Sequence, residues 1–313
     1  MSFTSRSPLR RRGLAAAGTA AVLALTLAAC GASKDPSDAS SMPGMHHGSA
    51  SSPSASATGT PGMDHDSMPG MDHGGSGDGL ADAKDGYRLT SDVDQLPADK
   101  AGGYRFRITG PNGKPVTGFA VDQTKRMHFY AIRSDLTGFQ HLHPTMAGDG
   151  TWTAPLSPQK PGSWRMFASF TPDSGPGRGK GLVLSRTVTV PGESKRSPLP
   201  AATTSTEVDG YTVRVKGAPM AGMAHPLTVS VSKGGKPVTD LQPYLDTYAH
   251  LTAFHEGDQA FAHLHPETEV NGDHGGPNLS FHAELPKPGN WRMFLQFRTD
   301  GTLHTAALTL RVG

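Results

Sequence analysis

The most constraining feature of this sequence is an internal repeat. The stretch FQHLHP at residues 139–144 returns as FAHLHP at 261–266, and KPVT at 114–117 returns at 236–239, both with an offset of 122 residues. Further on, KPGSWRMF returns as KPGNWRMF with an offset of 127, so the second copy carries an insertion of five residues. A copy of about 105 residues is long enough to be a domain, so we expect two copies of one domain.

Each copy consists of short apolar stretches, among them YRFRITG and MHFYAIRS in the first and YTVRVKG and LTVSVSKGG in the second. Gly, Pro, Asn or Asp bounds these stretches, which is typical of β strands joined by turns. The 39 glycines and 26 prolines are too many for an architecture rich in helices. With about seven strands per copy, the sequence predicts an all-β fold of two tandem immunoglobulin-like β-sandwich repeats. We place them at residues 84–192 and 207–313, with a linker at 193–206.

The chain begins with a segment typical of exported proteins. Four arginines precede an uncharged apolar run, GLAAAGTAAVLALTLAA, that ends directly before Cys30 and is short for a membrane span. Its last residues and Cys30 resemble the lipobox of bacterial lipoproteins. The resemblance implies a signal peptide at residues 1–29, lipidation of Cys30 with palmitate, and attachment to the extracytoplasmic face of the cell membrane. An uncleaved anchor would leave the protein on the same side, and Arg11-Arg12 leaves export by the twin-arginine route open.

Composition excludes several classes of site. Cys30 is the only cysteine, so disulfides, thiolate catalysis and cysteine metal sites are excluded once it is lipidated. Removal of the signal takes away four arginines and no acid, which changes the net charge from +2 to about −2 and gives no indication of nucleic-acid binding. Residues 30–83 contain almost no large apolar side chains, so we expect them to form a disordered tether.

The tether is rich in methionine and histidine, for which a disordered chain has no packing use. The residues concerned are Met42, Met45, His46, His47, Met63, His65, Met68, Met71 and His73. Thioether sulfur prefers Cu(I), and imidazole accepts Cu(I) or Cu(II), so the sequence predicts copper capture here. The segment resembles the Met/His-rich tracts of periplasmic copper-resistance proteins, especially the MxGMxH runs of the multicopper-oxidase resistance family. The alternative is compositional drift without function.

Each repeat also carries three histidines in equivalent positions. In a strand, residues i and i+2 project from the same face, so His141 and His143 point together, as do His263 and His265. A third histidine, His128 or His250, lies thirteen residues earlier on the expected preceding strand. Neighbouring antiparallel strands would bring the three imidazoles together, which predicts one three-histidine metal site in each domain. The alternative is that these histidines are structural, as hydrogen-bonding groups beside a proline turn.

Other candidates are weaker. Met220, Met223 and His225 repeat the tether motif inside the second copy and form an auxiliary copper-site candidate, whereas Met166 and Met293 share a face with tryptophans and fit a core role. Enzyme signatures are missing: HEGD lacks the second histidine of a zinc-protease helix, GPGRGKG lacks the Ser or Thr of a phosphate loop, and no GxSxG elbow occurs.

The stretches HLTAFHEGDQAFAHLHP and PGNWRMFLQF resemble a group of secreted or lipid-anchored bacterial proteins, often encoded with metal-handling genes. With the motifs above, this leads us to expect a non-enzymatic, lipid-anchored copper-binding protein that captures, buffers or relays the metal. It would act beside other envelope metal-handling proteins. Three alternatives stay open: a cell-envelope interaction module with structural histidines, a zinc-binding protein, and an enzyme with an open three-histidine metal position.

Overall fold

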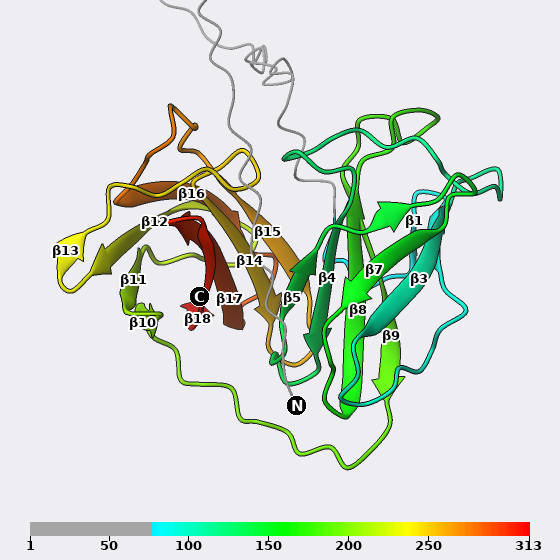
Figure 1. The fold of residues 1–313 in the computed structure, drawn as a ribbon, viewed down its shortest axis with the longest axis horizontal. Coiled ribbons are helices and arrows are strands. Elements are labelled where there is room, and N and C mark those ends of the chain that lie inside the picture. Colours follow the sequence, from blue (N-terminus) through cyan, green and yellow to red (C-terminus); the bar gives the residue numbers. More distant parts are fainter. Residues whose placement is uncertain (1–76) are drawn as a thin grey trace, which may run out of the picture. The chain divides into compact units, whose positions relative to one another are not determined.

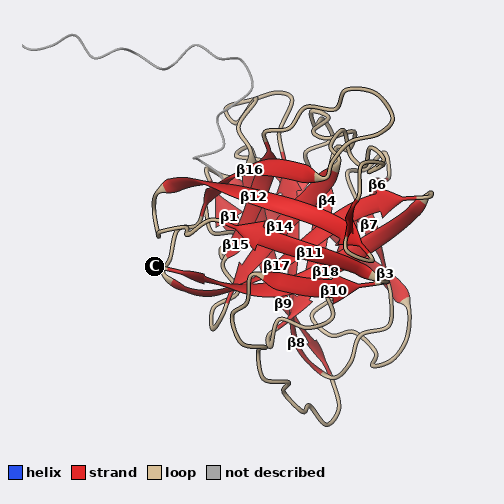
Figure 2. Ribbon diagram, turned by 90° about the vertical axis from the view of Figure 1, so that its left-hand side faces the viewer, coloured by secondary structure: helices blue, strands red, loops and turns tan. Residues whose placement is uncertain are grey.

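A computed structural model describes residues 77–313 of the chain. Within this range the backbone forms strands, turns and loops, as the red and tan segments of Figure 2 show, and it contains no helix. The described residues therefore include no apolar helix of membrane-spanning length. The signal segment, Cys30 and the methionines and histidines of the tether lie outside the described residues.

The first repeat forms two antiparallel sheets. Its strands are β1 (Ala83–Lys84), β2 (Tyr87–Thr90), β3 (Gly102–Thr109), β4 (His128–Arg133), β5 (Gln140–Leu142), β6 (Thr145–Met146), β7 (Trp152–Leu156), β8 (Gly162–Phe170) and β9 (Leu182–Val190). One sheet has the order β1-β2-β3-β7-β6 and the other the order β5-β4-β8-β9. The chain crosses between the sheets after β3 and returns at β6, so both sheets contribute to one core. Figure 1 shows β3 and β7 of one sheet and β4, β5, β8 and β9 of the other.

The second repeat has the same strand order. Its strands are β10 (Ser205–Val208), β11 (Tyr211–Lys216), β12 (Ala224–Lys233), β13 (Lys236–Pro237), β14 (Ala249–His255), β15 (Phe261–Pro266), β16 (Asn278–Glu284), β17 (Gly289–Thr299) and β18 (Thr302–Val312). They follow the path β10-β11-β12-β16-β15-β14-β17-β18, with β13 beside β12. This all-β architecture of two tandem sandwiches confirms the predicted fold class.

One strand distinguishes the two copies. In the first repeat, β5 pairs with β4, and β6 pairs with β7 in the other sheet; His143 and Pro144 separate them. In the second repeat, the single strand β15 pairs with β14 through its first residues and with β16 through its last two. The HLHP motif thus lies in both repeats where the chain passes from one sheet to the other.

The two cores are built from equivalent residues. Trp164 and Trp291 are both buried, and each indole Nε1 donates a hydrogen bond to the carbonyl of a lysine four residues earlier, at 2.9 and 3.0 Å. Met166 and Met293 are fully buried in the cores of their repeats. Their position agrees with a packing role, because a buried thioether fills space between aromatic side chains.

A third apolar cluster joins the repeats. In β4, alternate residues face the core of the first repeat, while Tyr130 and Ile132 face outward; all six residues of the strand are buried. The outward residues pack against Phe254, Phe261 and Phe294 of the second repeat. A strand that is apolar on both faces is typical of a sheet covered on both sides, so the outer sheets of the two repeats bury each other.

The last residues assigned to the tether belong to the fold. The carbonyl of Asp78 accepts a hydrogen bond from the amide of Phe261 in the second repeat, and the carbonyl of Ala81 accepts one from Ser185 in the first. Lys287 forms an ion pair with the Asp78 carboxylate at 3.2 Å. This attachment is hard to predict from the sequence, because Leu80 is the only large apolar side chain in the segment 77–83.

Candidate metal centre

The histidines of the first repeat lie on two neighbouring strands. His128 begins β4, and His141 lies in β5 opposite Tyr130, with His143 just beyond the end of β5. The ring centroid of His128 is 5.4 Å from that of His141 and 5.2 Å from that of His143, and the latter two rings are 4.8 Å apart. The hairpin expected from the sequence thus gathers the three imidazoles.

The second repeat repeats this placement on β14 and β15. His263 lies opposite Thr252, and its ring centroid is 4.3 Å from that of His250, which is fully buried. His265 pairs through its backbone with His282 of β16. The equivalent hairpin therefore also carries neighbouring imidazoles.

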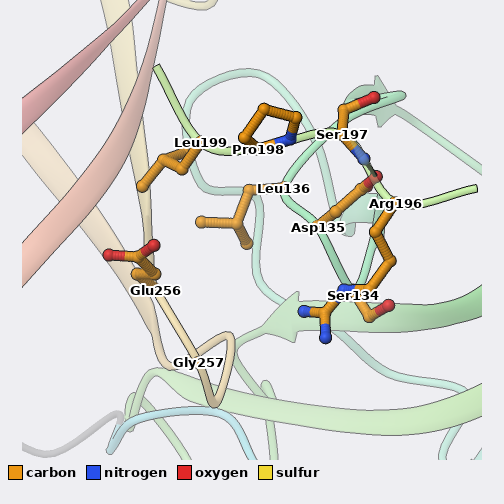
Figure 3. A pocket seen from close by; sticks show the side chains of 9 residues that line it. All are labelled: Ser134, Asp135, Leu136, Arg196, Ser197, Pro198, Leu199, Glu256 and Gly257. Atoms are coloured by element: carbon orange, nitrogen blue, oxygen red, sulfur yellow. Dashed lines mark hydrogen bonds between the residues drawn. The ribbon is translucent and has the colours of Figure 1, made fainter. Parts of the chain in front are cut away.

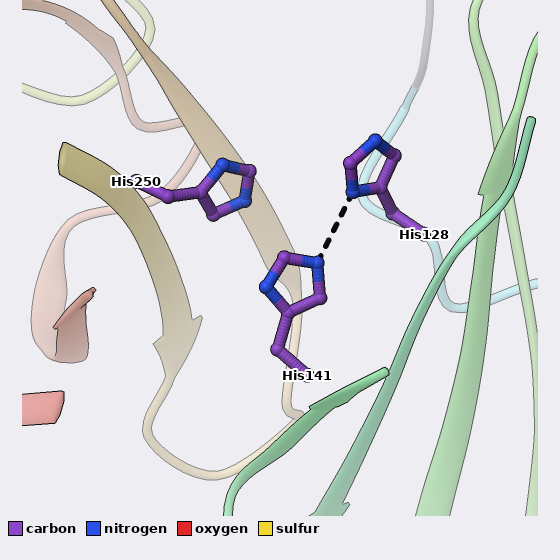
Figure 4. A group of neighbouring side chains, drawn as sticks. All are labelled: His128, His141 and His250. Carbon is purple, nitrogen blue, oxygen red and sulfur yellow. Dashed lines mark hydrogen bonds between the residues drawn. The ribbon is translucent and has the colours of Figure 1, made fainter. Parts of the chain in front are cut away.

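The two sets lie together rather than apart. The ring centroid of His250 is 4.6 Å from that of His141 and 5.8 Å from that of His128. One ring nitrogen from each of these three residues lies within 4.8 Å of the others, and Figure 4 shows the rings turned toward one another. We expected one separate site in each domain, but this tightest group draws on both. The reason is that the histidines share the outward faces through which the repeats pack.

Hydrogen bonds on the outer side of the cluster fix the tautomers of two rings. His128 Nε2 lies 3.1 Å from the carbonyl oxygen of Asp122, and His141 Nδ1 lies 2.7 Å from Oε1 of Gln296 in the other repeat. The Gln296 amide nitrogen donates to Thr305, which agrees with this orientation of the amide. Oxygen of either kind only accepts, so these two ring nitrogens carry the protons.

The remaining nitrogens of the same two rings face each other. His128 Nδ1 and His141 Nε2 are 3.1 Å apart, and in neutral rings with the tautomers above both carry lone pairs (Figure 4). A proton on one of these nitrogens would turn the contact into a hydrogen bond, but burial lowers the pKa of His128 and lowers that of His141 well below 6.5. A metal ion bound by both nitrogens removes the repulsion between the lone pairs without a proton. Two nitrogens bound at about 2.0–2.1 Å to a tetrahedral ion lie about 3.3 Å apart, close to the separation found here.

Tyr130 supports the cluster from the first repeat. Its hydroxyl lies 3.1 Å from Nε2 of His250, and its ring stacks on that of His141 with centroids 4.4 Å apart. Burial raises the pKa of Tyr130, so the hydroxyl remains protonated at neutral pH. Metal-bound histidines are commonly held by such outer hydrogen bonds, which orient the ring.

His143 offers a further imidazole to the cluster. Its Nε2 atom is buried and has no hydrogen-bond partner among the described residues. Burial lowers the pKa of His143 to about 4, with smaller contributions from the charges of His128 and Lys125. The ring is therefore neutral at physiological pH, which is the form that binds metals.

Sequence reasoning missed the residues that support the rings. Asp122 acts through its backbone, and Tyr130 and Gln296 become relevant only because the repeats pack together. A signal for the packing was present, since stretches such as FYAI at residues 129–132 are apolar at both sets of alternating positions. Such segments predict strands covered on both faces, although not what covers them.

A separate pocket lies away from these ligands. It has a volume of about 340 Å³ and is drawn in Figure 3. Its lining residues are Ser134, Asp135, Leu136, Arg196, Ser197, Pro198, Leu199, Glu256 and Gly257. The Asp135 carboxylate accepts a hydrogen bond from the Ser197 amide and pairs with Arg133, which also donates to the carbonyl of Lys195. These contacts hold the linker against the first repeat, and linker residues 196–199 form part of the pocket wall.

The comparisons with known proteins identify a family but no activity. A family described as a domain of unknown function, DUF8832, matches residues 81–188 and 206–313, so each repeat is one copy of its domain. A search among curated proteins found no match.

Several solved structures show similarity. FdeC, an Escherichia coli adhesin, is 17% identical over 74% of this chain and 65% of its own, with a TM-score of 0.24. This chain thus spans less than two thirds of that structure. InvD of Yersinia pseudotuberculosis is 14% identical over 73% of this chain and 58% of its own, with a TM-score of 0.23. The Ig1-2 module of the Drosophila receptor tyrosine phosphatase DLAR is 8% identical over 72% of this chain and 98% of its own, with a TM-score of 0.20.

Proposed function

This chain belongs to the DUF8832 family, and we propose that its two copies of the domain bind one copper ion between them. His128, His141 and His250 are the ligands, and His143 and His263 flank them with further imidazoles. The protein captures and holds the metal outside the cytoplasm. No catalytic step is part of the proposal.

One observation carries the proposal above the others. The facing nitrogens of His128 and His141 are both lone-pair atoms when the outer nitrogens donate to Asp122 and Gln296. Such a contact between neutral rings is unfavourable without a cation between them. If the histidines were only structural, one of the facing nitrogens would be expected to donate to the other, as buried polar groups usually do.

Copper is favoured over zinc by the tether. The donor set of neutral imidazoles accepts Cu(I), Cu(II) and Zn²⁺ alike. The five tether methionines, however, provide thioether sulfur, which binds Cu(I) and has little use for zinc. A tether that collects copper beside a folded site that holds it accounts for both features, whereas zinc accounts only for the histidines.

The proposal includes a lipid anchor at Cys30. The apolar run and small residues before this cysteine support cleavage and acylation at that position. Expression of the full precursor and of a Cys30→Ala variant, followed by membrane fractionation and labelling with a palmitate analogue, tests it. We expect the label and tight membrane association only with Cys30 present. An unlabelled precursor would refute lipidation.

The copper site is tested by stoichiometry in single and double variants. The mature chain, with Cys30→Ser to remove the thiol, is loaded anaerobically with Cu(I), freed of loose metal and measured by elemental analysis. His128→Ala, His250→Ala and the double variant are compared with His274→Ala, which lies in the β15–β16 connection.

We expect each single variant and the double variant to lose the same one copper per chain, while His274→Ala loses none. A double variant that loses two would mean separate sites in the two repeats. If all variants retain the wild-type copper content, and circular dichroism shows that they are folded, the proposed metal site is refuted. The interaction module with structural histidines would then be the remaining interpretation. Parallel loading with Zn²⁺ decides whether zinc competes.

A further inference from the structure

The hexapeptide M-x-G-M-x-H occurs three times in the chain. Two copies, at residues 42–47 and 68–73, belong to the tether, and the third, at 220–225, lies in the second repeat. At the equivalent positions of the first repeat, Ala98, Ala101 and Gly103 replace the two methionines and the histidine. The fold therefore does not require these side chains, since the first repeat forms the same architecture without them.

The folded copy adopts a tight turn. The amide of Met223 lies 3.4 Å from the carbonyl oxygen of Met220, which is the bond that closes a four-residue turn. Gly222 has a φ of +67°, a conformation that side chains other than glycine rarely adopt. The turn thus explains the glycine of the motif, and it places the two thioethers at its first and last positions.

Three backbone hydrogen bonds hold this turn against neighbouring segments. The amides of Ala221 and Gly222 donate to the carbonyls of Gly313 and Leu285, and the amide of Gly313 donates to Pro219. A turn held on both sides presents its side chains in a fixed arrangement. Pre-arranged ligands lose less conformational entropy on binding than ligands on a segment without a fixed conformation.

The two methionines are exposed, whereas Met146 is partly buried and three further methionines of the fold are buried. Met220 and Met223 are 51% and 53% exposed, whereas Met127, Met166 and Met293 are at most 1% exposed. Exposed methionine contributes nothing to the core. Its thioether sulfur is left accessible to soft cations.

His225 follows the turn near the start of β12. It alternates with Leu227 and so lies on the inner face of the strand, two residues after Met223. Its Nε2 atom is buried and makes no hydrogen bond among the described residues, although a buried ring nitrogen normally has a partner. A metal ion is one such partner.

We propose that Met220, Met223 and His225 form a second metal site, specific for soft monovalent cations such as Cu(I) or Ag(I). Two thioethers and one imidazole form a neutral donor set that favours these ions over Zn²⁺ or Cu(II). The site is independent of the inter-repeat histidines, because it lies within one repeat and uses none of them. It stands whether or not the inter-repeat centre binds copper.

The test follows the oxidation of individual methionines in the full mature chain. Hydrogen peroxide converts exposed methionine to the sulfoxide, and a thioether bound to a metal is protected. Rates for each methionine are measured by peptide mass spectrometry with and without excess Ag(I), which does not change oxidation state. The wild type is compared with His225→Ala and with His282→Ala on the neighbouring strand β16.

With Ag(I) about ten times above its dissociation constant, we expect oxidation of Met220 and Met223 to slow roughly tenfold. The protection should weaken in His225→Ala and persist in His282→Ala, while the tether methionines behave alike in all three proteins. Unchanged oxidation rates for Met220 and Met223 in the wild type would overturn the site. Protection that is undiminished in His225→Ala would overturn the three-ligand arrangement.

Discussion

His128 Nδ1 and His141 Nε2 face each other at 3.1 Å, and the tautomer of His141 is set by Gln296 of the other repeat. The second repeat thus contributes His250 to the cluster and also decides which nitrogen of His141 is available to a metal. A site of this kind exists only where both copies of the domain are folded and packed together.

Gln296 is therefore expected to act as a positioning residue. Replacing it with leucine removes the acceptor for His141 Nδ1 while keeping the size of the side chain, and the ring loses its fixed tautomer. We expect copper affinity to fall about 10- to 100-fold, measured by competition with a chromophoric chelator. Gln140→Leu is the matched control, because Gln140 is adjacent to His141 but bonds to Ser157. Equal affinities in both variants would contradict the role.

Phe294 is expected to hold the two repeats together. Its ring stacks on that of Phe139 with centroids 4.2 Å apart and an interplanar angle of 8°, and it is buried. Phe294→Ala should lower the free energy of unfolding by about 3 kcal/mol, measured by urea denaturation. Leu303→Ala, at an exposed position, should change it little. A loss no larger than that of the control would mean that the interface adds little stability.

The ion pair of Arg133 and Asp135 is expected to be structural. The two charged groups are 3.1 Å apart, and their side chains are 7% and 2% exposed. Asp135→Asn leaves a buried arginine without its counter-charge, so we expect a loss of about 3 kcal/mol in urea denaturation. Asp82→Asn removes the exposed pair with Arg88 and should cost much less. Copper content should not change in either variant. A loss of copper in Asp135→Asn would show that copper binding depends on this attachment of the linker.

The metal-free protein should lose stability as the pH falls from 6.5 toward 4. Burial lowers the pKa of His128 and His141 below 6.5 and that of His143 to about 4. Rings of this kind bind protons mainly in the unfolded chain. Their contribution to stability is therefore complete above the unfolded pKa of 6.5 and is lost below it.

Calorimetric melting temperatures of the metal-free protein between pH 7.5 and pH 4 check this. We expect a steady fall that is smaller in His143→Gln, because that variant no longer takes up a proton at this position. A melting temperature that stays constant across this range would show that the cluster is hydrated more than its burial indicates.

The sequence defined much of the local arrangement. The equal spacing of the two HLHP motifs predicted the repeat, and strand alternation placed His141 and His143 together beside His128 on the preceding strand. Those inferences depend on contacts within one hairpin, where the backbone period of two residues fixes which side chains are neighbours.

What the sequence by itself determined is therefore the unit: an all-β domain, present twice, with histidines on one face of a hairpin. Only the tertiary structure decided that the two histidine faces meet, that Tyr130 and Gln296 support the rings, and that residues 77–82 belong to the fold. The physical reason is that strand alternation is local, whereas the choice of partner for an outer sheet face depends on how apolar side chains from distant segments, such as Tyr130 and Phe261, pack together.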